Sequence, residues 1–443
     1  MTIRASTVLL LCAWLSVAAT PANRQPVAPA PAGAPLVLAN VTVIDGRGGA
    51  PHERQTVVIR DGRIALLGPS AATRIPPGAQ VLDLAGHTVL PGLIDGHAHL
   101  GADRPAIEKY LAFLFNGGIT SVRDMAGDSF LYSQLAPAAQ EAKRPMARLY
   151  YAANWAGPSF WDDRRWVGST QGKLPGHVPW AREITAATEL RAEAAAARAM
   201  GVTGIKVYSD IAPDVVARIS AAARAFGLKT WSHPAVFPTR PSDVVRSGVD
   251  VISHAALFVW EGADALPTTY HSGVHTDFGP PAPYAEVPVT SPPIVRVLDA
   301  MQQRGTMLDA TVSTIPFSLS QPAAEWGYQF TALARRMGIR VVAGTDRDAL
   351  QTTDGYPTLF EEIEALVSRC GFSPLEAITA ATRHGALALG VEADYGTVEP
   401  GKVADLVVVR GHPQADIRRL RDVTHVIKMG QVHRVSRRRL NNP

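Results

Sequence analysis

The sequence predicts an α/β protein, a (β/α)8 TIM barrel joined to a small β-sandwich domain that is built from both ends of the chain. Two observations carry this prediction. Apolar strand-like runs alternate with Ala-rich helical stretches through the middle of the chain, and short alternating β-runs lie before and after that middle. The 443 residues are enough for a barrel of about 250 residues or more with an appended domain.

Composition places the chain among globular proteins, with 47% hydrophobic and 19% charged residues. The net charge of +4 is small for this length, and no basic stripe is interleaved with aromatic residues, which argues against a nucleic-acid partner. No later segment is long and apolar enough to form a stable membrane span. The expected partner is a small-molecule substrate, and the sequence is compatible with a homo-oligomer.

The N-terminus has the pattern of a targeting signal. Arg4 supplies a positive region, and the apolar run that follows is short for a membrane span. Residues 1–22 are therefore predicted to be a signal peptide, followed by a Pro/Ala-rich spacer at 23–35. We expect an exported protein, either periplasmic or secreted. Removal of Cys12 with the signal would leave Cys370 alone, so no intrachain disulfide is expected.

The region after the spacer contains short β-runs that alternate apolar and polar residues, and Asp61-Gly62 marks a hairpin turn between two of them. Similar runs close the chain, beginning with GTVEPGKVADLVVVR at 396–410. We therefore expect the two chain ends to join in one β-sandwich domain, with the barrel inserted between them. The predicted boundaries are 36–87 and 391–437 for the β-sandwich domain and 88–390 for the barrel.

The middle of the chain contains eight strand candidates, the number that closes a (β/α)8 barrel. The first is 88–99, with a bend or bulge at Pro91-Gly92. Alanine-dominated stretches at 185–200 and 213–227 predict helices between strands. The other seven strand candidates are 118–124, 147–153, 203–209, 228–233, 249–254, 306–311 and 340–346.

Two histidines separated by one residue, His97 and His99, end the first of these runs in PGLIDGHAHL. Alternate side chains of a strand share a face, so both imidazoles point the same way and can reach one metal ion at about 2.0–2.1 Å. A bare His-x-His also arises by chance, or as two packed histidines. The rest of the chain has to decide between these possibilities.

Further polar residues end the later strands, where barrel enzymes place their chemistry. Lys206 lies in the apolar run GIKVY, and Asp346 ends the last strand in VVAGTD. His233 and His254 end the two strands that follow Lys206. Each alone could have an ordinary structural role, as a packed histidine, a turn-forming aspartate or a lysine that reaches solvent. Chance rarely places all of them in this order at successive strand ends, so the combination predicts a functional site.

This pattern resembles the amidohydrolase superfamily of metal-dependent hydrolases over nearly the whole chain from about Leu36. The resemblance lies in PGLIDGHAHL, GITSVRD, GIKVY, the two strand-end histidines, AGTD and the closing GTVEPGKVADLVVV. The chain looks most like the imidazolonepropionase-related and bacterial prolidase-like branch, which acts on amides and dipeptides.

The resemblance implies a binuclear metal centre of two divalent ions, with zinc as the default metal. His97, His99 and Asp346 would bind the first ion. Lys206, carboxylated by CO2, would bridge to a second ion held by His233 and His254. Metals about 3.5–4 Å apart activate a hydroxide, and Asp346 would act as the general base that takes its proton.

One departure from the superfamily bears on the reaction. Its deaminases usually carry a Glu three residues after the strand-5 histidine, and here that position is Val236. Ring deamination is therefore disfavoured, and we expect hydrolysis of an amide C–N bond in a dipeptide or N-acyl amino acid. The alternatives are an esterase or lactonase on the same site, a cyclic amidase with a mononuclear site, and a non-catalytic binding scaffold.

Three further residues are candidates for substrate binding. Tyr208 shares a strand face with Lys206 and could hold a substrate carboxylate, with a structural tyrosine as the alternative. Arg123 and Asp124 end the second strand, and for Arg123 an internal Arg–Asp pair that supports the barrel is the alternative to a substrate contact. His177 loosely matches a Gly-Gly-His-like segment of prolidase-like members, within a longer and more aromatic loop.

Overall fold

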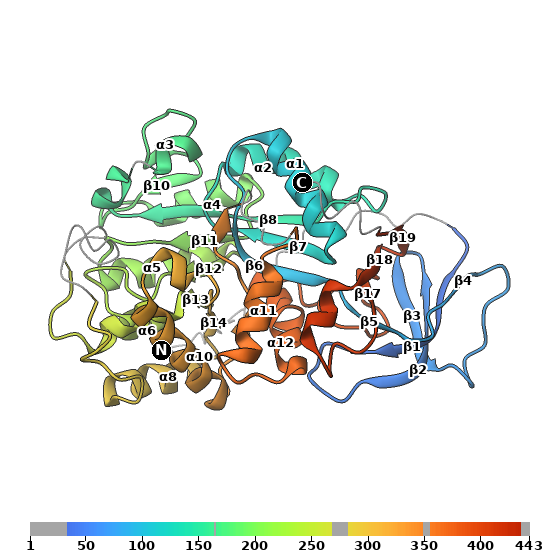
Figure 1. Ribbon diagram of the computed structural model, residues 1–443. Helices are drawn as coiled ribbons and strands as arrows, with labels where there is room; N and C mark the ends of the chain where they lie inside the picture. The colour runs from blue at the N-terminus through green and yellow to red at the C-terminus, as the bar shows by residue number, and fades with distance from the viewer. Residues whose placement is uncertain (1–32, 164, 268–281, 349–354, 436–443) are drawn as a thin grey trace, which may run out of the picture.

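The computed structural model describes residues 33–163, 165–267, 282–348 and 355–435. The predicted signal peptide and most of the spacer lie outside the described residues. Within those ranges, the helices are too short or too polar to cross a membrane. A barrel with its surrounding helices occupies one side of the molecule, and a smaller sheet occupies the other (Figure 1).

The larger part is the predicted (β/α)8 barrel. Its strands pair in parallel in chain order. The ring closes where the Gly96 N–H donates to the Ala343 carbonyl at 2.9 Å and where the short β16 (Arg347–Asp348) pairs with the first strand. The barrel strands are β6 (Leu93–His99), β7 (Ile119–Asp124), β8 (Arg148–Ala156), β11 (Gly204–Val207), β12 (Lys229–Ser232), β13 (Val251–Ser253), β14 (Met307–Asp309) and β15 (Val341–Val342).

Helices surround the barrel strands (Figure 1). The expected helix at 213–227 is α5, which ends before Gly227 at φ +67°. The expected helix at 185–200 begins only at Leu190, because Thr185 and Thr188 form a turn in which the Thr185 N–H donates to the Thr188 hydroxyl. The helices are α1 (Arg104–Asn116), α2 (Ser129–Gln140), α3 (Arg165–Ser169), α4 (Leu190–Ala199), α5 (Pro213–Ala225), α6 (Pro241–Arg246), α8 (Pro292–Arg304), α9 (Ile315–Ser318), α10 (Gln321–Arg336), α11 (Leu359–Ser368), α12 (Pro374–Ala380) and α13 (Arg383–Leu389). Three 3-10 turns, η1 (Pro158–Asp162), η2 (Ala255–Gly262) and η3 (Ile417–Arg421), and the β-hairpin of β9 (His177–Val178) and β10 (Ala181–Glu183) complete the described elements.

The smaller part is a sheet that joins strands from both chain ends. The predicted hairpin is present, with Asp61 at φ +49° and Gly62 at φ +71°, the left-handed pair of a type I′ turn. The sheet contains β1 (Leu36–Val43), β2 (His52–Arg60), β3 (Arg63–Pro69), β4 (Gln80–Asp83), β5 (His87–Pro91), β17 (Leu406–Arg410), β18 (Val423–Lys428) and β19 (Gln431–Arg434).

The run expected as one barrel strand at 88–99 is two strands. β5 pairs with β17 in the small sheet, and β6 pairs with β7 in the barrel. The change of sheet falls at Pro91-Gly92, where a bend or bulge was expected. A Cβ on Gly92 would lie 2.1 Å from the hydroxyl oxygen of Thr120 in β7, so the close approach of the chain to β7 at this point requires glycine.

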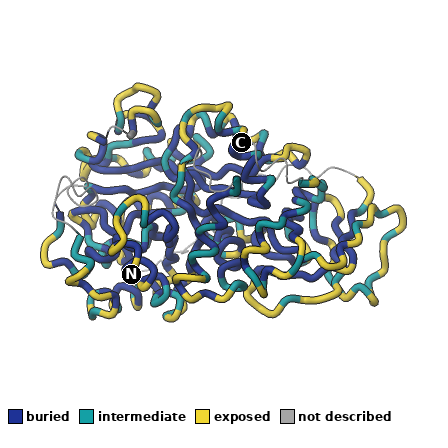
Figure 2. Tube along the Cα trace, viewed as in Figure 1, coloured by how far each residue is buried: buried dark blue, intermediate teal, exposed yellow. Residues whose placement is uncertain are grey.

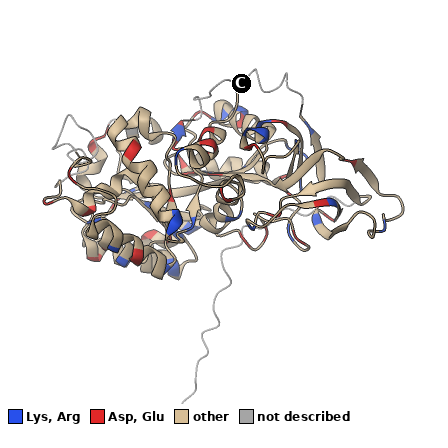
Figure 3. Ribbon diagram, turned by 60° about the horizontal axis from the view of Figure 1, so that its bottom comes forward, with Lys and Arg blue, Asp and Glu red and all other residues tan. Residues whose placement is uncertain are grey.

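The two parts pack against each other through buried residues (Figure 2), because Leu90 of β5 and Val407 and Val409 of β17 join the core of the barrel, while other residues of the small sheet form a cluster of their own. Arg148 of β8 and Asp405, which precedes β17, form a buried ion pair with Nε and Oδ2 2.7 Å apart. Lys428 at the end of β18 is fully buried, and its ammonium donates to the carbonyls of Ala139 and Met146 at 2.6 and 2.7 Å. Acidic and basic residues are interspersed over both parts (Figure 3), in line with the small net charge of +4.

Candidate metal centre

Three histidines surround the Asp346 carboxylate at the carboxyl end of the barrel strands. The Nε2 atoms of His99 and His97 lie 2.8 and 3.3 Å from Asp346 Oδ1. His254 Nδ1 lies 3.6 Å from Oδ2. One ligand atom each from His97, His99 and Asp346 lies within 4.8 Å of the others. Two imidazoles and a carboxylate at this spacing form a donor set that suits a divalent metal ion, so these residues fit the group that the sequence implies.

His233 and Lys206 lie close to His254 or to its neighbour Ser253. The ring centroids of His233 and His254 are 4.7 Å apart. The Lys206 Nζ lies 3.3 Å from the hydroxyl of Ser253, the residue before His254. The structure therefore brings all six expected ligands to one end of the barrel, as a close trio and a looser one.

The backbone at the strand ends is held in an unusual conformation. His254, Thr311 and Asp346 all have positive φ, at +67°, +48° and +51°, although none is glycine. Each such residue costs on the order of 1–3 kcal/mol and persists only where surrounding contacts fix it. The Asp346 N–H donates to the His97 carbonyl at 2.8 Å, and the Thr311 hydroxyl lies 3.1 Å from His254 Nδ1. Strain at successive strand ends is thus built into the position of the candidate ligands.

A fully buried carboxylate that the sequence analysis missed lies behind His97. Asp309 Oδ2 is 2.7 Å from His97 Nδ1, and it accepts hydrogen bonds from Arg123 Nη2 at 3.0 Å and the Ser253 hydroxyl at 2.9 Å. A carboxylate on one ring nitrogen fixes the tautomer and leaves Nε2 as the ligand atom. The signal was present in TMLDAT, where Asp309 ends an apolar strand run just as Lys206 interrupts one.

Burial sets most of the protonation states in the cluster. It lowers the pKa of Lys206 to about 7 and that of His254 to about 3. Burial also works to raise the pKa of Asp346, but its electrostatic interactions with His254 and His97 and its hydrogen bond with His99 hold it well below the usual range. Burial works to lower the pKa of His99, but the hydrogen bond with Asp346 and the charges of Asp346 and Asp124 together raise it. An ionised carboxylate beside largely neutral imidazoles is the state that binds a cation, and His99 would release its proton on binding.

The site opens toward solvent on one side. The side chains of His99 and Asp346 are 24% and 21% exposed, whereas that of His97 is 1% exposed. A small molecule arriving from solvent therefore meets His99 and Asp346 first.

The three candidate substrate-binding residues have different surroundings. Tyr208 lies beside the cluster, with its ring centroid 4.9 Å from that of His233 and its hydroxyl donating to the Met125 carbonyl at 2.8 Å. Arg123 is fully buried against the Trp231 ring and pairs with Asp309, which is the internal Arg–Asp pair that was the alternative to a substrate contact.

His177 lies on the exposed face of β9, and none of its described contacts is to the histidine cluster. A substrate role for His177 therefore has no support in the described residues. The sequence match that suggested it was loose, and the loop that carries it departs from the family pattern.

A barrel with imidazole, amine and carboxylate groups gathered at its strand ends is the architecture of a metal-dependent hydrolase. The amidohydrolase family model matches residues 294–433. An imidazolonepropionase from Symbiobacterium thermophilum is 25% identical over 375 residues, which cover 79% of this chain and 82% of that protein.

Solved structures show the same fold. A Xaa-Pro dipeptidase with bound methionine is 22% identical, with a TM-score of 0.69 over 90% of this chain and 100% of that one. The ochratoxinase of Aspergillus niger is 20% identical, with a TM-score of 0.69 over 90% of this chain and 95% of that one. The family model and the imidazolonepropionase support a place for this chain in the amidohydrolase superfamily, on its prolidase-like and imidazolonepropionase-like branch, and therefore an enzyme of that class.

Proposed function

We propose that this protein is an exported metal-dependent hydrolase that cleaves the amide C–N bond of a dipeptide or an N-acyl amino acid. The observation that carries the proposal is the gathering of His97, His99 and Asp346 within 4.8 Å, with the other three expected ligands beside them. The names of the relatives, a dipeptidase and an imidazolonepropionase, support hydrolysis at a C–N bond. The N-terminal signal pattern supports export.

Divalent ions held by these ligands would supply an activated water and polarise the substrate carbonyl. Asp346 has the properties of the general base, because it is ionised at neutral pH and is 21% exposed on the open side of the site. It would take the proton of the attacking water and pass it to the nitrogen of the leaving amine. His97 is held by Asp309, so it keeps one ring orientation throughout.

Lys206 is the residue on which the second metal depends. Its amine is fully buried, and burial brings its pKa to about 7, so a large fraction is uncharged at neutral pH. An uncharged amine can attack CO2, forming an N–C bond and releasing one proton. The resulting carbamate is an anion with two oxygen atoms, which can bridge two cations where an ammonium cannot.

The second candidate is a cyclic amidase with a mononuclear site. The observation that favours it is that only His97, His99 and Asp346, among the described residues, meet the spacing of a single metal site. In that case Lys206 remains a plain amine next to Ser253.

Metal content per chain separates the two candidates. We expect two metals in the wild type and one or none in Lys206→Ala, with no change in the control Lys109→Ala, whose side chain is exposed. One metal in both the wild type and Lys206→Ala would favour the mononuclear site. The metal-loaded protein should then be assayed on matched panels of dipeptides, N-acyl amino acids, esters and cyclic amides. Turnover of none of the dipeptides and N-acyl amino acids would overturn the proposed reaction, and preference for esters would point to an esterase or lactonase.

A further inference from the structure

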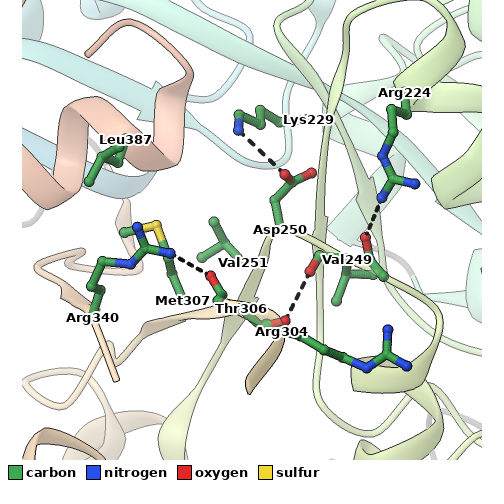
Figure 4. A pocket seen from close by; sticks show the side chains of 12 residues that line it. Arg224, Lys229, Val249, Asp250, Val251, Arg304, Thr306, Met307, Arg340 and Leu387 are labelled. Atoms are coloured by element: carbon green, nitrogen blue, oxygen red, sulfur yellow. Dashed lines mark hydrogen bonds and ion pairs between the residues drawn. The ribbon is translucent and has the colours of Figure 1, made fainter. Parts of the chain in front are cut away.

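A cavity lies at the opposite end of the barrel from the histidine cluster. Its volume is about 440 Å³ (Figure 4). Lys229, Val251 and Met307, which are the first residues of β12, β13 and β14, line it. The candidate metal ligands follow the carboxyl ends of the strands, so this cavity is separate from the site described above.

The lining of this cavity carries an excess of positive charge. Four cations line it, each from a different segment: Arg224 from the last turn of α5, Lys229 from β12, Arg304 from the end of α8, and Arg340 from just before β15. One carboxylate, Asp250, stands among the lining residues. Asp250 accepts from Lys229 Nζ at 3.3 Å and from the Thr230 N–H at 2.8 Å, so it is already engaged.

Two of the guanidinium groups are held by backbone carbonyls rather than neutralised by carboxylates. Arg224 Nη2 donates to the Gly248 carbonyl at 3.0 Å, and Arg340 Nη2 donates to the Gly305 carbonyl at 2.7 Å. Both glycines have positive φ, and a Cβ would lie 3.3 and 3.1 Å from these nitrogens. The guanidinium groups therefore pack over bare Cα atoms, which fixes their position while their charge and their other N–H donors stay available.

Arg304 has no hydrogen bond or ion pair among the described residues, and it is solvent-exposed. Figure 4 shows the four cationic side chains placed around the cavity from several directions. Cations that share one cavity repel each other, and an anion bound between them relieves that repulsion. Guanidinium groups match the oxygens of phosphates and carboxylates through paired N–H donors.

We propose that this cavity binds an oxyanion that carries two or more negative charges, such as a phosphate or a dicarboxylate. The anion lies among Arg224, Arg304 and Arg340, with Lys229 completing the positive wall. Because these residues come from α5, β12, α8 and the segment before β15, a bound anion links four segments at this end of the barrel. Binding does not depend on the histidine cluster or on its metal.

The test is a calorimetric titration of the full-length, metal-loaded protein with inorganic phosphate, and separately with succinate, at constant ionic strength. We expect one saturable site per chain for at least one of these probes, and the probe that binds identifies the source of the oxyanion. Arg304→Gln should weaken binding by about tenfold or more, since it removes charge-assisted hydrogen bonds. Arg304 holds no other described group, so this variant should fold normally.

Two matched controls separate this site from general charge effects and from the metal centre. The double variant Arg60→Gln/Arg74→Gln removes two exposed arginines from the small sheet domain and should bind as the wild type does. His97→Ala should also keep the oxyanion site. The proposal is overturned if neither probe shows saturable binding, if Arg304→Gln and the Arg60/Arg74 control weaken binding equally, or if His97→Ala abolishes it. Unchanged binding in Arg304→Gln/Arg340→Gln would place the anion elsewhere and would also refute the proposal.

Discussion

Replacement of Asp309 by asparagine tests whether this buried carboxylate positions a metal ligand. Asp309 is completely buried, and its Oδ2 serves His97 Nδ1 at 2.7 Å, Ser253 at 2.9 Å and Arg123 at 3.0 Å. Asp309→Asn keeps the shape of the side chain but removes its charge. An amide also presents an N–H group where some of these partners need an acceptor.

Two separate losses are expected, and each has its own size. The Arg123 guanidinium would remain buried without its counter-charge, which costs about 3–5 kcal/mol of the free energy of unfolding. His97 would lose the carboxylate that fixes its tautomer, and changes of this kind lower metal affinity by about 10–100-fold. A purely structural residue would cause the first loss without the second.

The free energy of unfolding is measured by urea denaturation of the metal-free protein, and metal affinity by competition with a chromophoric chelator. The matched control is Asp394→Asn, which removes the partner of Arg63 at 2.9 Å in a partly exposed pair remote from the site. The control should cost at most about 1 kcal/mol and leave metal affinity unchanged. If Asp309→Asn loses stability but keeps the wild-type metal affinity, the positioning role of Asp309 is wrong.

Three further predictions concern packing, the junction between the two parts and pH. Gly344→Ala should lower metal affinity and cost about 1–3 kcal/mol of the free energy of unfolding, because the new Cβ would lie 2.4 Å from Asp309 Oδ1, next to His97. The control Gly168→Ala, which has open space around it, should be neutral. Lys428→Met should cost about 1–3 kcal/mol in urea unfolding, since it leaves carbonyls at the junction without a donor, whereas Lys109→Met should stay within about 0.5 kcal/mol. Burial raises the pKa of Glu362 from 4.5 to about 8, so between these pH values the folded state holds a proton that the unfolded chain releases. As the pH rises from 4.5 to 8, the free energy of unfolding of the wild type should therefore fall relative to that of Glu362→Gln. A difference that stays flat or rises would contradict this prediction.

The barrel and its expected ligands could be predicted because their signals are local. Each expected ligand ends or interrupts an apolar run, and the strand ends of a barrel meet at one face whatever the loops do. The partner of Arg123 could not be found in this way. An internal Arg–Asp pair was among the expectations, but no local pattern identifies Asp309 as the partner, because it lies 186 residues away in the sequence.

The division of the run at 88–99 into β5 and β6 also could not be predicted, because it depends on which strands each half pairs with. Both halves contain residues suited to a strand, and Pro91-Gly92 between them fits a bulge within one strand as well as a break between two. The choice of sheet depends on the pairing of β5 with β17, which lies more than 300 residues further along the chain, and of β6 with β7, the next strand. The local sign of the division is Gly92, where the chain passes from one sheet to the other and where Thr120 lies too close for any side chain.

Asp309 also bears on how the two halves of the candidate metal centre depend on each other. Its Oδ2 accepts from the Ser253 hydroxyl, and the same hydroxyl oxygen lies 3.3 Å from Lys206 Nζ. One carboxylate thus orients His97 in the close trio and, through Ser253, the lysine of the looser one. The two halves are joined through fully buried groups, where no solvent screens their charges. A change in the charge of Lys206 should therefore change the electrostatic potential at Asp309. Carboxylation of Lys206 would place an anion beside this network, and bound divalent ions would supply the charge that balances it.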